Sequence, residues 1–203
     1  MDRSVSTSFA LASLAAIAGT NLVGCVDARG SYDEFGDRLV DAGNGDIDGE
    51  VVSELPNVDG EWRLVVHPAN LPEDKLLFFN ATFDLTAVSA NTGKMEMNAQ
   101  PLSYTDMTAV GAAFVAHDRH VASDATFDAP FVGTLPGPAN PITQVDVNVN
   151  STLDAVLKTD NFVCGTLSGQ AGSLPLAGTT WAAVRLDAAT SDFIFRCEDQ
   201  PAP

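Results

Sequence analysis

Three histidines are the side chains of this sequence best suited to metal or acid–base chemistry. The segment His117–His120 begins and ends with an imidazole, so a strand end at this point would bring the two rings together. His67 or Asp124 would then supply a third ligand, as in an open zinc site. The alternative is that the segment forms a polar hairpin tip without a metal, and we favour this second interpretation.

Paired carboxylates offer a second possible chemistry. Asp124 and Asp128 lie on one face of an extended segment, and such a pair hydrolyses glycosides when one acid has a raised pKa in a cleft. A pair is also expected by composition, because 27 side chains are acidic. The chain has no GxSxG elbow, P-loop, HExxH or strand-linked GxGxxG motif. We therefore do not expect an enzyme, and keep a metal-dependent enzyme only as an alternative.

The segment Asn44–Val51 resembles the first eight positions of an EF-hand calcium loop. Oxygen ligands stand at alternate positions, with glycine at the sixth; the candidate ligands are Asn44, Asp46, Asp48 and Glu50. The second half of the pattern fails, because the twelfth position is Leu55 and Pro56 leaves no room for an exiting helix. A weak calcium site is one interpretation. We favour the other, a solvated acidic linker.

The start of the chain has the pattern of a secretory signal peptide: one basic residue, Arg3, an apolar run, and then Leu22-Val23-Gly24-Cys25. This ending resembles the lipobox of bacterial lipoproteins, which implies removal of residues 1–24 and lipidation of Cys25. Val26 stands where an aspartate would retain such a protein at the inner membrane. The resemblance therefore implies an outer-membrane lipoprotein, periplasmic or at the cell surface. The alternative is an ordinary signal peptide followed by an incidental cysteine.

If Cys25 carries lipid, Cys164 and Cys197 remain as an even pair. An exported protein meets an oxidising compartment, so we expect them to form a disulfide. Closing the loop between these two cysteines lowers the entropy of the unfolded chain, which stabilises the folded state by roughly 3–4 kcal/mol in the entropic model. Two free thiols acting as metal ligands are the alternative, but no CxxC spacing supports them.

For the rest of the chain we predict an acidic tether over 25–59 with one short helix at about 31–41, a β domain over 60–198 and a tail over 199–203. Period-two alternation with Pro and Gly between runs predicts an all-β domain, an antiparallel β-sandwich or β-barrel of about eight strands. The segment 152–157 also suits a helical turn, and Pro130, Pro136, Pro138 and Pro141 predict a loop. The expected strands are 61–66, 75–88, 94–100, 108–116, 126–132, 145–149, 162–167, 180–186 and 192–197.

Gly60-Glu61-Trp62 resembles the G-x-W that opens the first strand of lipocalins, small eight-stranded barrels that carry apolar ligands. Thr159-Asp160-Asn161 is similar to their T-D-Y, with Asn161 in place of the aromatic residue, and Arg185 stands where their closing arginine would meet Trp62. The arrangement is also similar to β-rich lipid-anchored proteins of Gram-negative envelopes. That similarity includes Phe162-Val163-Cys164-Gly165 and implies no activity.

The net charge of −17 repels phosphate backbones, so nucleic acid is not an expected partner. The expected partners are a membrane, through the lipid anchor, and an envelope protein or a small apolar ligand. The sequence thus predicts an exported lipoprotein that binds or supports an envelope structure without catalysis. A lipocalin-like barrel for a small apolar ligand and a calcium-binding protein are the alternatives, and calcium is the one cofactor considered.

Overall fold

The computed structural model describes residues 53–69, 71–186 and 193–201. The predicted signal peptide, Cys25, the predicted short helix and the calcium candidates Asn44, Asp46, Asp48 and Glu50 lie outside the described residues.

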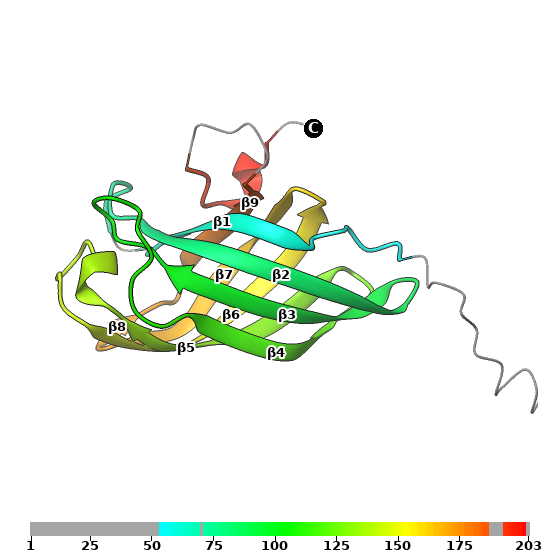
Figure 1. Ribbon diagram of the computed structural model, residues 1–203, viewed down its shortest axis with the longest axis horizontal. Helices are drawn as coiled ribbons and strands as arrows, with labels where there is room; N and C mark the ends of the chain where they lie inside the picture. Colours follow the sequence, from blue (N-terminus) through cyan, green and yellow to red (C-terminus); the bar gives the residue numbers. More distant parts are fainter. Residues whose placement is uncertain (1–52, 70, 187–192, 202–203) are drawn as a thin grey trace, which may run out of the picture. The chain divides into compact units, whose positions relative to one another are not determined.

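The all-β prediction is confirmed, and the architecture is a nearly closed antiparallel barrel rather than a sandwich (Figure 1). Neighbouring strands follow one another along the chain, and β1 pairs with both β2 and β9. A short strand, β8, pairs with β7. Within the described residues the helical turns are two 3-10 segments, Gly137–Ala139 and Cys197–Asp199. The strands are β1 Gly60–His67, β2 Leu77–Ser89, β3 Thr92–Pro101, β4 Phe114–Val121, β5 Thr126–Leu135, β6 Val147–Thr159, β7 Phe162–Ala171, β8 Leu174–Pro175 and β9 Thr179–Arg185.

The interior of the barrel is packed with side chains, because each strand turns its alternate apolar residues inward. Near the middle, the rings of Phe114 and Phe131 stack with centroids 4.2 Å apart. Phe79 meets both edge-on, at 6.0 and 5.4 Å. Such aromatic pairs add to the burial energy of the rings. Met95 and Met97, which alternate along β3, are both buried.

The strands β4 and β5 meet at a seam. Both are fully described, and no backbone ladder joins them; the Arg119 guanidinium bridges them instead, donating to the Asp128 carbonyl at 2.8 Å and to its carboxylate at 2.6 Å. The prediction of a loop at Pro130 is wrong, because Pro130 pairs with Thr152 inside β5. The backbone carbonyls of Thr126 and Asp128 point to the β4 side of β5. Because backbone groups two residues apart on a strand point the same way, the nitrogen of Pro130 also faces the seam. Its missing N–H therefore costs no ladder hydrogen bond.

Two further predictions about the strands are wrong at the β3–β4 connection. The strand after β3 is Phe114–Val121 and not 108–116, because 102–113 forms a loop with left-handed backbone at Met107 and Gly111. His117–His120 therefore lies within β4 and is not a hairpin tip; the turn falls at 122–125. A bulge in β4 sets His117 and Asp118 opposite Glu96.

The ambiguous segment 152–157 belongs to β6. The predicted strand over 192–197 is wrong for its described part: Phe193–Asp199, which we call the strap, lies against the outer wall without joining the sheet. The predicted disulfide between Cys164 and Cys197 is confirmed and attaches the strap to β7. Ile194 and Cys197 cover an outer apolar cluster of Phe162, Cys164, Ala182 and Val184. The strap's Phe-Ile-Phe alternation thus reflects packing on a wall and not strand pairing.

The ends of the barrel differ. At the closed end, the hairpins β2–β3, β4–β5 and β6–β7 turn tightly, and Leu55 and Val58 of the preceding segment are buried beside them. At the other end, which we call the mouth, longer connections join β1 to β2, β3 to β4, β5 to β6 and β7 to β9 (Figure 1).

Candidate functional site

The closed end is sealed by Arg185. Its guanidinium lies over the Trp62 ring, 4.8 Å from the ring centroid. It donates to the carbonyls of Asn57, Asp59 and Asp160 at 2.5–2.9 Å. Gly60 is required beside it, because its φ is +129° and a Cβ there would lie 2.9 Å from the guanidinium. These contacts fix the segment before β1 and the β6–β7 turn to the end of β9.

The three histidines do not come together. The Nδ1 atom of His117 lies 2.5 Å from Glu96 Oε2, and the Asp118 N–H donates to Oε1 of the same carboxylate at 2.8 Å. This backbone hydrogen bond, followed by the bond to His117, holds the pKa of Glu96 below its ordinary value. His67 is on β1 at the mouth, where its Nε2 lies 3.2 Å from the Leu71 carbonyl oxygen. The pair Glu96–His117 therefore pins the β4 bulge, and no third ligand lies beside it in the described part of the chain.

Asp124, another proposed ligand, is part of a turn. Its carboxylate accepts from the Thr126 hydroxyl at 2.6 Å and from the Thr126 N–H at 3.2 Å, which lowers its pKa. Among the described residues no group of three His, Cys, Asp or Glu side chains is placed to hold a metal ion.

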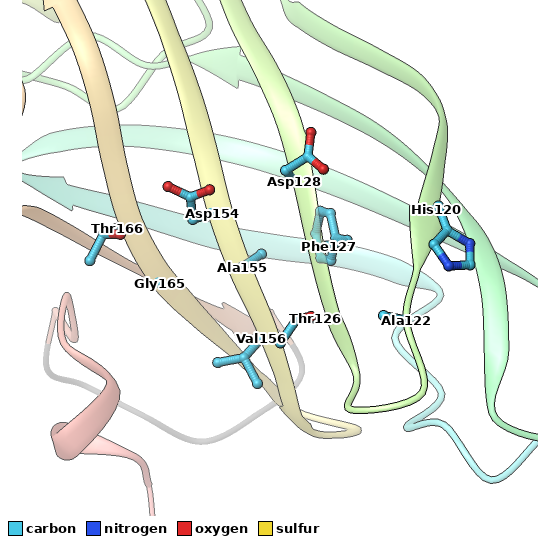
Figure 2. Close-up of a pocket in the computed structure, with 10 residues that line it drawn as sticks. All are labelled: His120, Ala122, Thr126, Phe127, Asp128, Asp154, Ala155, Val156, Gly165 and Thr166. Carbon is cyan, nitrogen blue, oxygen red and sulfur yellow. The ribbon is translucent and has the colours of Figure 1, made fainter.

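An open groove of about 460 Å³ runs over the outer wall beside the seam (Figure 2). Asp128 and Asp154 stand directly opposite each other on β5 and β6, and Figure 2 shows their carboxylates on the same side, with His120 across the seam. Ala155 and Gly165, which pair across β6 and β7, also line it. Because Asp128 is already paired with Arg119, the groove is a surface depression with acidic walls and not an assembled ligand set.

The mouth holds a second hollow, of about 390 Å³, which we call the mouth pocket. This volume is in the range of small-molecule sites. None of its described lining residues is charged, and Asn140, Thr143 and Ser173 are its polar side chains. The apolar lining comes from β2, β5, β6, β8 and the loops between strands: Pro68, Leu71, Leu77, Leu135, Ile142, Val145, Val147, Leu174 and Leu176.

The β5–β6 loop holds one wall of the mouth pocket in place. The buried Asn140 amide donates to the Thr143 hydroxyl at 2.8 Å and to the Val145 carbonyl at 2.9 Å, and its oxygen accepts from the Ile142 N–H at 3.1 Å. Asp146 accepts from the Gly137 N–H at 2.8 Å. The amide of Asn140 is thus used within the loop. The loop leaves Ile142 and Val145 exposed at the lip of the pocket.

Beneath the mouth pocket lies an enclosed apolar cavity of about 30 Å³. Leu77, Leu135 and Leu176 line both spaces, and Phe79, Phe114 and Phe131 also line the cavity. A cavity of this size has room for a water molecule or two but offers no polar partner. The centre of the barrel is therefore filled with side chains, and the larger of these two hollows lies at the mouth.

Sequence reasoning did not find the mouth pocket. Its residues come from five separate stretches of chain, and none carries a chemical group that stands out in a sequence. The one signal was the density of Pro and Gly after Leu135, which predicts a long connection and hence an open end.

Comparison of the chain with models of protein families, with curated proteins and with solved structures finds no match. Among the residues that the structure describes, no helix is long and apolar enough to cross a membrane.

Proposed function

We propose that this protein is an exported lipoprotein, anchored through Cys25, whose barrel binds a small apolar ligand at the mouth. The observation that carries the binding proposal is the mouth pocket: about 390 Å³, lined by apolar side chains and open to solvent. Apolar patches that stay exposed in a protein mark binding sites more often than scattered single residues do. The anchor rests on the lipobox pattern alone.

The ligand class follows from the lining. A pocket without charged side chains gives no compensation for a desolvated ion, so the bound part of the ligand is uncharged. The net charge of the chain, −17, further disfavours anionic ligands at the approach to the site. We therefore propose a neutral hydrocarbon-rich molecule, with hydrogen bonds to Thr143 or Ser173 as its polar contacts.

Binding is tested with the neutral fluorophore N-phenyl-1-naphthylamine, using the full chain with Cys25→Ser throughout so that no acyl chain competes. Val145→Asp places a carboxylate at the lip, and because Val145 is already 58 % exposed, folding is little affected. The matched control is Val88→Asp on β2, where valine is 59 % exposed. We expect Val145→Asp to weaken binding by about tenfold or more and the control to leave it unchanged. Equal affinities in both variants, or no binding by the parent chain, would overturn the proposal.

The anchor is tested separately, by incorporation of radiolabelled palmitate in a Gram-negative host. The parent chain should be labelled and Cys25→Ser should not. Label of equal intensity in both chains, or in neither, would refute lipidation at Cys25 without bearing on the mouth.

A further inference from the structure

The strap touches the loop that forms one wall of the mouth pocket. We call this loop, which joins β1 to β2, the mouth loop; Pro68 and Leu71 are its contributions to the pocket. Arg196 of the strap donates to the Glu73 carboxylate at 2.7 Å. Phe195 packs on His67, with ring centroids 4.8 Å apart, and His67 in turn contacts the Leu71 carbonyl. The strap therefore contacts the mouth loop directly through Arg196 and indirectly through Phe195 and His67.

The disulfide is what keeps these contacts in place. The Arg196–Glu73 pair is exposed, with side chains 36 % and 68 % accessible, and pairs of this kind contribute little by themselves. Phe193 packs on Phe78 yet stays half exposed. The strap already follows β9 along the chain, and the bond from Cys197 to Cys164 attaches it a second time, to β7; this keeps its contacts at short range and raises their effective concentration.

We propose that the strap positions the mouth loop, so that the thiol–disulfide state of Cys164 and Cys197 controls the affinity of the mouth pocket for its ligand. This inference rests on the proposed function and adds the regulation of the same site. With the disulfide formed, the mouth loop holds Pro68 and Leu71 against the pocket. With the disulfide reduced, the strap separates and the loop samples arrangements in which that wall is missing.

The step needs a dithiol reductant. Its thiolate attacks the sulfur of Cys197, which is half-buried, while Cys164 is fully buried; the disulfide breaks and Cys164 leaves as a thiolate that takes up a proton. The second thiol of the reductant then displaces Cys197 from the mixed disulfide. The products are two protein thiols and the oxidised reductant, and two electrons pass to the protein.

The test compares N-phenyl-1-naphthylamine affinity of the oxidised full chain, carrying Cys25→Ser, with that of the same chain in dithiothreitol. Near-ultraviolet circular dichroism of Trp62 and Trp181, both fully buried, reports whether the barrel stays folded. We expect about fivefold weaker binding on reduction, the loss that follows when the competent loop arrangement is populated about a fifth of the time, with the tryptophan signal unchanged. Affinities that agree within the error of the titration would overturn the inference while leaving the proposed function intact. Absence of binding to the oxidised chain would instead refute the proposed function.

A second variant keeps the test decisive if reduction unfolds the barrel. Arg196→Gln removes the ion pair with Glu73 and leaves the disulfide intact. Lys94→Gln is the control, because it removes another exposed ion pair, with Asp118 at 3.0 Å. That pair lies in the half of the barrel nearer the closed end. We expect Arg196→Gln to weaken binding by only about twofold in the oxidised chain, in keeping with the small contribution of an exposed ion pair, and Lys94→Gln to leave it unchanged. Equal affinities for the two variants would count against the strap as a positioning element.

Discussion

At the closed end of the barrel, one arginine takes up the free carbonyls of three residues and stacks on a buried tryptophan; at the mouth, apolar side chains from five stretches of chain surround an open hollow. At the closed end, the hydrogen bonds from Arg185 satisfy these carbonyl groups and hold the segments that carry them in place. Incomplete burial at the second end leaves apolar surface that a ligand can cover. The contrast supports the proposal that one end of this fold serves stability and the other binding.

The largest effect we expect is at the junction between the mouth pocket and the inner cavity. Leu135→Ala should lower the free energy of unfolding by about 2–4 kcal/mol, because Leu135 is only 5 % exposed, and urea unfolding measures this. The change also joins the two hollows, so N-phenyl-1-naphthylamine should bind more tightly.

Leu153→Ala is the matched control for this change, since Leu153 is fully buried on β6 and lines neither hollow. It should cost a similar free energy of unfolding and leave probe affinity unchanged. Equal changes of affinity in both variants would show that the mouth pocket is not the binding site.

A smaller effect is expected at the closed end. Arg185→Gln removes the charge and most donors to the carbonyls of Asn57, Asp59 and Asp160, and should lower the free energy of unfolding by about 1–2 kcal/mol. Arg185→Lys should lose nearly as much, because an ammonium cannot reproduce the planar fork. Denaturant unfolding tests both variants, and their probe affinity should match that of the parent. A change of affinity would contradict the independence of the two ends.

The smallest effect concerns the Glu96 carboxylate, which pins the β4 bulge. Its pKa is lowered in the folded state by the Asp118 N–H and then by His117, so its contribution to stability is present above its unfolded pKa and disappears as the pH falls through its folded pKa. Glu96→Gln should therefore reduce stability at neutral pH, and the difference from the parent should shrink under acid. Urea unfolding from pH 7 to pH 3 measures this, with Glu61→Gln as an exposed control of the same charge. A difference that is independent of pH would argue against the proposed role of the carboxylate.

Much of the fold could be predicted because burial and side-chain period agree along the strands. The alternation in β2 and β3 identifies the inward residues, such as Phe83 and Met97, which are both buried. The β3–β4 connection could not be predicted, since Ala109, Gly111 and Ala113 are too small to signal a face. The prediction of a loop at Pro130 was wrong because a strand accepts a proline where it faces a seam. The position of the seam is a property of the whole sheet and cannot be read from the residues next to Pro130.

The candidate site was not predictable for a related reason. Sequence reasoning looks for side chains with reactive groups, and here such groups serve local structure: Glu96 and His117 pin a bulge, and Asp124 caps a turn. The mouth pocket is lined mostly by ordinary aliphatic side chains, brought together by three loops and the strand ends beside them. The Cys164–Cys197 bond was predictable by counting, but its position beside the mouth loop depends on the tertiary fold.

The seam between β4 and β5 affects how firmly the circumference of the barrel is fixed. Where β4 faces β5, both fully described, the circumference is maintained by the Arg119–Asp128 pair and the Phe114–Phe131 stack instead of a ladder. Widening there breaks a few side-chain contacts and spares every backbone bond of the neighbouring strands. We therefore expect any widening of the barrel to occur along this line, away from the β4–β5 turn, while the hydrogen-bonded strands keep their register.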